Sequence, residues 1–177
     1  MNVAFFCHSL LSDWNNGNAH FLRGLVSELA RMGHRVHAFE PHDAWSLKNL
    51  LEERPDFEVA ELSRYYPELE IEHTDADLGA CRATIKRYDL ERFELERALD
   101  GVELVIVHEW NEPELIRRLS ALRRRAGCRF RVLFHDTHHR SSSDSDAIAR
   151  MGIEEFDGVL AFGEAVRQRY LKAGWAK

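Results

Sequence analysis

The sequence predicts an α/β fold, in which helices cover both faces of a parallel sheet within a single domain. The first observation behind this prediction is a set of short, continuous apolar runs, such as residues 3–7 and 102–107, which are typical of strands buried on both faces. The second is that stretches of about 10–15 residues with helical periodicity separate these runs. The third is the length of 177 residues, which suits about one domain, taken as residues 1–177. The predicted fold is a doubly wound, Rossmann-like sheet.

Each expected element follows from a local pattern, which is weakest between residues 43 and 88. Strands are expected, in chain order, over residues 3–7, 35–39, 68–72, 102–107, 130–134 and 158–162. Helices are expected over residues 18–33, 44–53, 90–99, 111–127 and 164–173. Asn18 is the expected cap of the first helix and Gly33 its expected end. Pro113 opens the fourth helix, because proline is favoured in the first helical turn.

Charge and composition exclude several classes of protein. A net charge of −6 argues against a nucleic-acid-binding protein, which usually carries a basic field. No apolar run approaches the ~18 residues of a transmembrane helix, and the first residues lack the basic start of a signal peptide. The arginine-rich stretch 117–125 is interpreted as the solvated face of a helix. The cysteines, Cys7, Cys81 and Cys128, lie far apart and are expected to be reduced thiols in a cytoplasmic protein.

Histidines gather where the expected strands end. Open parallel sheets bind ligands outside the carboxyl ends of their strands. Six of the ten histidines follow expected strands: His8, His42, His108, His135, His138 and His139. The segment His108–Glu109–Trp110–Asn111 also combines an acid, an amide and an aromatic plane, a mixture that suits a sugar. The alternative is that Asn111 only caps a helix and Trp110 only packs.

The segment 15–18 leads directly into a helix N-terminus, which favours an anion such as a phosphate. Gly17 would let the ligand approach the backbone closely. The alternative is an ordinary loop with a helix cap. A dinucleotide fingerprint needs three glycines and only one is present, so a nicotinamide cofactor is disfavoured.

The segment His135–Asp136–Thr137–His138–His139 carries three imidazoles and a carboxylate. These groups could hold zinc or manganese, although no helical His pair with a catalytic Glu occurs. His135 and Asp136 could instead orient a hydroxyl by acid–base chemistry. The third possibility is a polar surface loop with one packed histidine. The small polar residues 141–146 that follow are expected to form a mobile loop or lid.

Four segments in order resemble GT-B glycosyltransferases. Residues 2–41 resemble the opening of that family, with residues 32–36 in the place of its R-G-H-x-V motif. Residues 107–111, 134–139 and 156–164 look like those of group 1, or family 4-like, enzymes in the subgroup related to spore-maturation-type glycosyltransferases. The likeness covers most of the chain outside about residues 43–88.

The resemblance implies two Rossmann-like domains that face a cleft, of which the N-terminal one chiefly binds the sugar acceptor. It implies that Asn16, Gly17 and Asn18 approach the diphosphate or sugar of a nucleotide-diphosphate-sugar donor, and that His135 contacts the transferred sugar or the acceptor with Asp136 beside it. The acceptor-binding candidates are His8, His20, His108, Glu109, Trp110, Asn111, His138 and His139. No metal or other cofactor is expected to be bound by this chain.

The family's donor-binding domain does not fit within 177 residues. The expected partner is therefore that C-terminal domain or a separately encoded subunit, without which little transfer is expected. Two other hypotheses stay open. One is a non-catalytic Rossmann-like binding module, whose tryptophans, Trp14, Trp45, Trp110 and Trp175, would mark a partner surface. The other is a metal- or nicotinamide-dependent enzyme that uses the histidine-rich edge.

Overall fold

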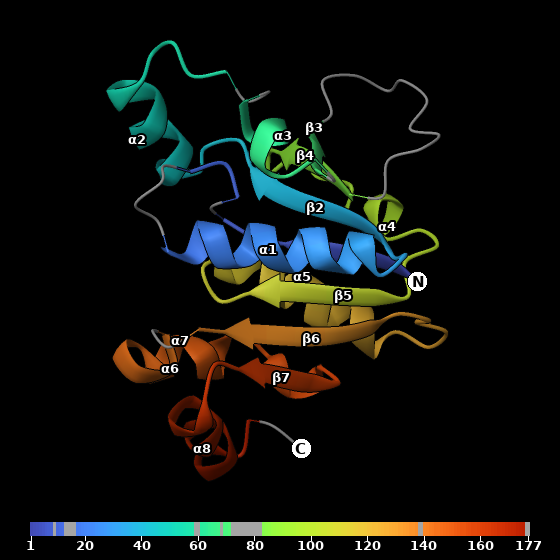
Figure 1. The fold of residues 1–177 in the computed structure, drawn as a ribbon. Helices are drawn as coiled ribbons and strands as arrows, with labels where there is room; N and C mark the ends of the chain where they lie inside the picture. The colour runs from blue at the N-terminus through green and yellow to red at the C-terminus, as the bar shows by residue number, and fades with distance from the viewer. Residues whose placement is uncertain are drawn as a thin grey trace. The chain divides into compact units, whose positions relative to one another are not determined.

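The structure is a computed structural model that describes residues 1–8, 10–12, 17–58, 61–67, 69–71, 83–137 and 140–175 (Figure 1). The chain divides into two compact units, Met1–Leu95 and Glu96–Lys177. Both units consist of parallel strands joined by helical segments, so the predicted Rossmann-like α/β class is confirmed. The assignment of residues 1–177 to one domain stays a prediction.

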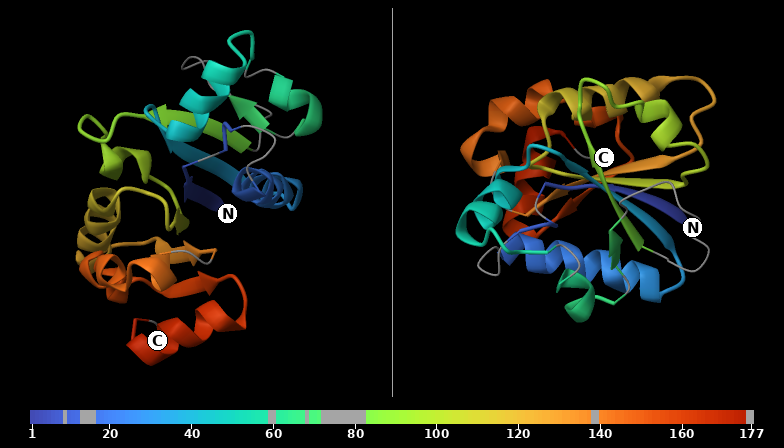
Figure 2. Two further views of the ribbon diagram at one scale, coloured as in Figure 1. Left: turned by 90° about the vertical axis from the view of Figure 1, so that its left-hand side faces the viewer. Right: turned by 90° about the horizontal axis from the view of Figure 1, so that it is seen from above.

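The first unit contains a four-stranded parallel sheet in the order β3-β4-β2-β1. Its strands are β1 (Asn2–Phe6), β2 (Arg35–Pro41), β3 (Leu69–Ile71) and β4 (Ala83–Tyr88). Its helices are α1 (Gly17–Arg31), α2 (Trp45–Glu53) and α3 (Leu62–Tyr65). Figures 1 and 2 show α1 running along one face of this sheet, on the crossover from β1 to β2.

Apolar side chains from β1, β2 and β4 form the core of the first unit. The rings of Phe6 and Phe39 stack with their centroids 5.0 Å apart. The ring centroids of Phe93 and Tyr88 lie 4.6 Å apart. Helix α1 ends in a Schellman motif at Gly33, whose φ of 93° suits only glycine well. In this motif the His34 N–H donates to Leu29 O and the Gly33 N–H to Ala30 O. The expected end of the first helix is therefore confirmed.

The second unit contains the parallel strands β5 (Leu104–His108), β6 (Arg131–Asp136) and β7 (Gly158–Ala161), in that order. Its helices are α4 (Leu95–Ala98), α5 (Pro113–Arg124), α6 (Arg140–Ser143), α7 (Ser145–Arg150), the 3-10 turn η2 (Ile153–Glu155) and α8 (Glu164–Ala173). Leu115, Ile116 and Leu119 form the fully buried face of α5. Arg117 and Arg124 lie on the solvated side of that helix, as the charge pattern predicted, and they pair with Glu114 and Glu155.

Several expectations about single elements are wrong. Residues 141–146 are not a loop: they belong to α6 and α7, with Asp144 accepting the Ala147 N–H at 3.0 Å as the cap of α7. The helix expected over 90–99 shrinks to α4, and β4 was not expected at all. Asn18 lies inside the first turn of α1 and not at its cap, since the helix begins at Gly17. Tertiary pairing and capping override the local pattern in these places.

The helices and the cysteines bear on whether the chain crosses a membrane and on the state of its thiols. Within the described part of the chain, no helix is both long enough and apolar enough to cross a bilayer. Cys7 and Cys128 are free thiols, and Cys81 lies outside the described residues. Burial raises the pKa of the Cys7 thiol well above its usual value, with a further contribution from the nearby Glu40 carboxylate.

Candidate functional site

Two buried histidines lie side by side at the carboxyl ends of β5 and β6. His108 pairs with His135 in the parallel register, so both side chains point to the same face of the sheet. Their ring centroids are 5.0 Å apart. His108 is fully buried and His135 is 4% exposed. The sheet therefore brings together two residues that are 27 positions apart in the sequence and were predicted to share a site.

The neighbouring acids point to the other face, because successive side chains in a strand alternate. Asp136 is fully buried and accepts a hydrogen bond of 2.7 Å from the Tyr170 hydroxyl of α8. Glu109 is also fully buried and accepts two bonds from Thr137, of 2.9 Å from the backbone N–H and 2.6 Å from the hydroxyl. His135 and Asp136 are adjacent in sequence, but their side chains lie on opposite faces of β6.

The turn after β5 is closed by its own polar side chains. Asn111 Nδ2 donates to His108 O at 2.8 Å, and the Asn111 backbone N–H donates to the same oxygen at 3.1 Å. The Trp110 backbone N–H lies 3.4 Å from His108 Nδ1. The Glu109 N–H donates to His135 O at 2.9 Å and extends the pairing past the end of β5. Helix α5 is capped at Glu112, so the alternative of Asn111 as helix cap is wrong.

Burial shifts the pKa values of Asp136 and His135. It raises the pKa of Asp136, and the neighbouring Glu109 carboxylate raises it further because two close negative charges repel. Burial lowers the pKa of His135, although Glu109 acts in the opposite direction. The His135 imidazole is therefore mainly neutral at neutral pH, and one of its ring nitrogens can accept a proton.

The first unit carries a separate group of polar and aromatic residues at the carboxyl end of its sheet. His8 follows β1, and its carbonyl accepts a 3.2 Å hydrogen bond from the Ser46 hydroxyl at the start of α2. The indole of Trp45 is 56% exposed, and its centroid lies 6.3 Å from that of the His8 ring. Trp45 was not among the predicted acceptor residues. The alternative hypothesis of a non-catalytic binding module counted it among the tryptophans of a partner surface, which requires such exposure.

The remaining predicted residues are placed as follows. Gly17 and Asn18 lie within α1 and not in a loop before it, and Asn16 lies outside the described residues. His20 is on α1, with Nδ1 3.4 Å from the Tyr66 hydroxyl. His42 is exposed after β2, with its N–H donating to Tyr88 O. His138 and His139 also lie outside the described residues. Their roles stay predictions.

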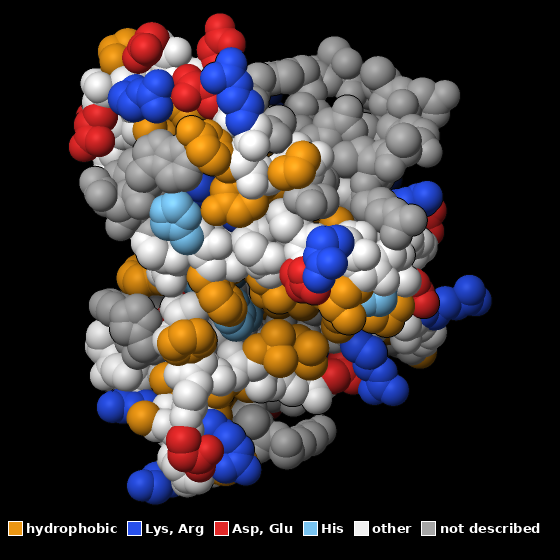
Figure 3. Space-filling view, in the orientation of Figure 1, with side chains coloured by type: hydrophobic (Ala, Val, Ile, Leu, Met, Phe, Trp, Pro, Cys, Tyr) orange, Lys and Arg blue, Asp and Glu red, His pale blue; other side chains and the backbone are white. Residues whose placement is uncertain are grey.

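An exposed apolar patch lies next to His135 in the second unit. Leu160 of β7 pairs with His135 in the register and is 39% exposed, and Phe162, just beyond the strand, is 61% exposed. Figure 3 shows apolar side chains gathered over β6 and β7. An apolar surface beside a polar cluster is a common arrangement for a binding site.

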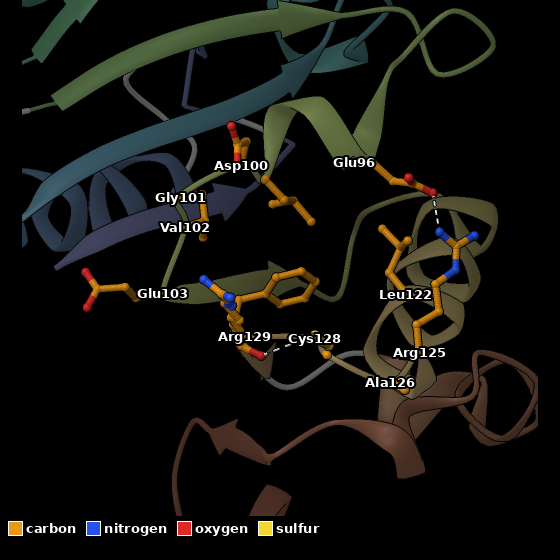
Figure 4. Close-up of a pocket in the computed structure, with 13 residues that line it drawn as sticks. Glu96, Asp100, Gly101, Val102, Glu103, Leu122, Arg125, Ala126, Cys128 and Arg129 are labelled. Carbon is orange, nitrogen blue, oxygen red and sulfur yellow. Dashed lines mark hydrogen bonds and ion pairs between the residues drawn. The ribbon is translucent and has the colours of Figure 1, made fainter.

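A cavity of about 500 Å³ lies near the other ends of β5 and β6 (Figure 4). Its lining comes from α4, the turn at 101–103, the end of α5 and the turn at 125–130. Arg125 pairs with Glu96 at its rim. None of the predicted site residues lines it. Because open parallel sheets bind ligands at the carboxyl ends of their strands, we assign this cavity no role.

Among the described residues, no group of three or more His, Cys, Asp or Glu side chains could hold a metal ion.

Comparisons with known proteins do not identify the chain. No known protein family, curated protein or solved structure matches the sequence or the fold.

Proposed function

We propose that this chain is the acceptor-binding part of a nucleotide-sugar-dependent glycosyltransferase. The observation that carries the proposal is the pairing of His108 and His135 at the carboxyl ends of β5 and β6, in a segment whose sequence resembles that family. A second, donor-binding domain or subunit belongs to the proposal, as the resemblance implies. The donor would be a nucleotide-diphosphate sugar, and the acceptor a hydroxyl of a small molecule or glycan.

In this proposal His135 binds the reacting acceptor hydroxyl. A neutral imidazole can accept the proton of that hydroxyl while the oxygen forms its bond to the anomeric carbon and the nucleoside diphosphate leaves. The low pKa of His135 supports this role, because a protonated ring could not accept the proton. Glu109 and Asp136 hold the ends of the two strands through Thr137 and Tyr170, and so fix the position of the imidazoles.

Trp45 and His8 are proposed to form a sugar-binding surface of the first unit. The apolar C–H face of a sugar packs well on an exposed indole, and a neighbouring imidazole can bind a hydroxyl. The first turn of α1, with Gly17 and Asn18, is proposed to meet the donor diphosphate, because the helix N-terminus attracts anions. These roles agree with the resemblance and with the position of each residue after its strand.

A second candidate function is a binding module without catalysis. The exposed side chains of Leu160, Phe162 and Trp45 favour it, because exposed apolar residues commonly mark protein interfaces. In that case His108 and His135 would only shape the surface, and no nucleotide sugar would be consumed.

The test is transfer by the natural gene product, alone and with its donor-binding partner, from a panel of nucleotide sugars. His135→Gln keeps hydrogen-bonding capacity but cannot accept a proton, and we expect it to lower kcat by about 100-fold or more. His42→Gln is the matched control, since this exposed histidine also follows a strand but has no role in the proposal. Circular dichroism confirms that both variants fold. The proposal is wrong if no nucleotide sugar is consumed, or if His135→Gln transfers sugar as fast as the wild type.

A further inference from the structure

The backbone turn after β5 determines which ring nitrogen of His108 carries a proton. The Trp110 backbone N–H donates to His108 Nδ1 at 3.4 Å. A ring nitrogen that accepts a hydrogen bond cannot carry a proton of its own, so the proton of the neutral imidazole lies on Nε2. His108 is therefore a hydrogen-bond donor at Nε2.

Asn111 holds this turn in place. Its side-chain amide and its backbone N–H both donate to His108 O, at 2.8 Å and 3.1 Å. Asn111 and His108 are both fully buried, so water does not compete for these hydrogen bonds. The two bonds close residues 108–111 into one turn, and this turn directs the Trp110 N–H toward the imidazole.

His135 presents the complementary group beside this donor. The two histidines pair in the parallel register, and their ring centroids lie 5.0 Å apart with the ring planes inclined by 58°. Burial lowers the pKa of His135, so its imidazole is mainly neutral at pH 7 and can accept a proton. Because a hydrogen bond spans about 3 Å, one oxygen atom of a ligand can reach a nitrogen of each ring.

The more exposed side of this pair lies toward β7. His108, His135 and Leu160 follow one another across β5, β6 and β7 in the register, so their side chains share one face of the sheet. The exposed fraction rises along this row from 0% through 4% to 39%. A ligand that approaches from β7 therefore meets Leu160 first, then His135, and His108 last.

We propose that His108 binds the oxygen of the acceptor hydroxyl as a fixed hydrogen-bond donor, while His135 accepts the hydrogen of the same hydroxyl. The inference rests on the proposed function, because it takes His135 to accept that proton. A hydroxyl oxygen has two lone pairs, of which one accepts the His108 Nε2–H and the other forms the bond to the anomeric carbon. The bond from that carbon to the nucleoside diphosphate breaks, and its electron pair leaves with the diphosphate. Two proton-accepting rings would instead compete for the single hydroxyl hydrogen.

The first measurement is the tautomer of His108, by ¹⁵N NMR of the imidazole nitrogens in the labelled 177-residue chain at pH 7. We expect a protonated Nε2 and an unprotonated Nδ1, and the signals that disappear in His108→Gln identify the residue. Exposed His42 is the control, since its ring is free to exchange between both tautomers in water. A proton on Nδ1, or on both nitrogens, overturns the inference without any nucleotide sugar in the experiment.

The second measurement is transfer by the natural gene product with its donor-binding partner. The side-chain amide of Gln reaches the place of Nε2 and can donate there, whereas the shorter amide of Asn lies near the place of Nδ1. We expect His108→Gln to keep kcat/KM within about threefold of the wild type, and His108→Asn to lower it by about tenfold or more. His42→Asn is the matched control, and circular dichroism shows whether each variant folds.

The outcomes separate this inference from the proposed function. If His108→Asn transfers sugar as fast as the wild type, the inference is overturned while the role of His135 stands. If the wild type consumes no nucleotide sugar, the proposed function is wrong, and the role of His108 is overturned with it whatever its tautomer. Should His108→Asn fail to fold, the NMR measurement and His108→Gln still decide, because a folded His108→Gln that loses transfer contradicts a donor at Nε2.

Discussion

The Tyr170 hydroxyl of α8 donates a 2.7 Å hydrogen bond to the carboxylate of Asp136 at the end of β6. Tyr170 is 1% exposed and Asp136 is fully buried, so water cannot replace this bond. The same tyrosine ring lies 6.3 Å from that of Phe134, two residues earlier on the strand. Helix α8 is thereby fixed against the strand that carries His135.

We expect Tyr170→Phe to lower the free energy of unfolding by about 1–3 kcal/mol, because it removes one hydrogen-bond donor of a buried carboxyl group. The variant keeps the ring and its packing, so the loss reports the hydrogen bond. Urea unfolding at pH 7 measures it, with Tyr65→Phe as control, since Tyr65 is 63% exposed. Equal unfolding midpoints for Tyr170→Phe and the wild type would show that the bond contributes nothing.

Asp157 joins the start of β6 to the end of α5. Its carboxylate accepts two bonds of 2.9 Å from Arg123, one of 2.7 Å from Arg131 and one of 2.8 Å from the Val132 N–H. We expect Asp157→Asn to cost about 2–3 kcal/mol at pH 7, as for a partly buried charged pair that is broken on one side. Asp56→Asn, at an exposed turn, should cost little.

This effect has a defined pH dependence. The Arg123 guanidinium holds the pKa of Asp157 well below its usual range. The stabilisation is therefore complete above the unfolded-state pKa of about 4 and is lost as the pH falls toward the folded-state value. The difference in unfolding free energy between the wild type and Asp157→Asn should shrink below pH 4, and a constant difference down to pH 2 would contradict this account.

Glu40 should show the opposite dependence. Its pKa is raised to about 8, so the stability associated with it is present below the unfolded-state value and is lost as the pH rises toward 8. Glu40→Gln does not titrate, and we expect it to gain on the order of 1–3 kcal/mol over the wild type between pH 5 and pH 9. Urea unfolding at both pH values tests this, with exposed Glu53→Gln as control. A gain that is the same at pH 5 and pH 9 would mean that Glu40 titrates normally.

Trp45 allows a test of acceptor binding that is separate from stability. Because its indole is 56% exposed, Trp45→Ala should change the unfolding free energy by no more than about 0.5 kcal/mol. We expect the KM for the acceptor to rise about tenfold with kcat nearly unchanged, as for a group that binds ground state and transition state equally. Tyr65→Ala removes another exposed ring and should leave KM unaltered. A kcat effect without a KM effect would remove Trp45 from the acceptor site.

Six of the seven strands of the described residues and the long helices were predictable from local patterns. Residues 3–7 and 158–162 are apolar runs, and the structure forms β1 and β7 there within one or two residues. Helix α8 occupies the expected residues 164–173, since its periodicity and the glycines on either side agree. The strand β4 was missed because Ala83–Tyr88 mixes apolar, basic and small residues, and its pairing with β2 and β3 makes it a strand.

The candidate site was predictable as a set of positions and not as an arrangement. The rule for parallel sheets places His108 and His135 at one edge, and the structure agrees. Strand alternation then separates His135 from Asp136, although they are neighbours in the chain. The polar run 141–146 suggested mobility, but Asp144 caps a helix there and Ser141 is 4% exposed. Small polar residues serve equally well in loops and in caps, so composition could not distinguish the two.

The sequence by itself determined the α/β class, the order of its main elements and the presence of histidines at strand ends, because periodicity and strand termini are local properties. Only the tertiary structure decided which groups hold one another. The partners of Arg23, Glu40 and Asp136 lie 13, 29 and 34 positions away, at Leu10, Leu11 and Tyr170. A buried charged or polar group must find its hydrogen bonds in whatever the fold brings beside it, and that choice is made by packing between distant segments.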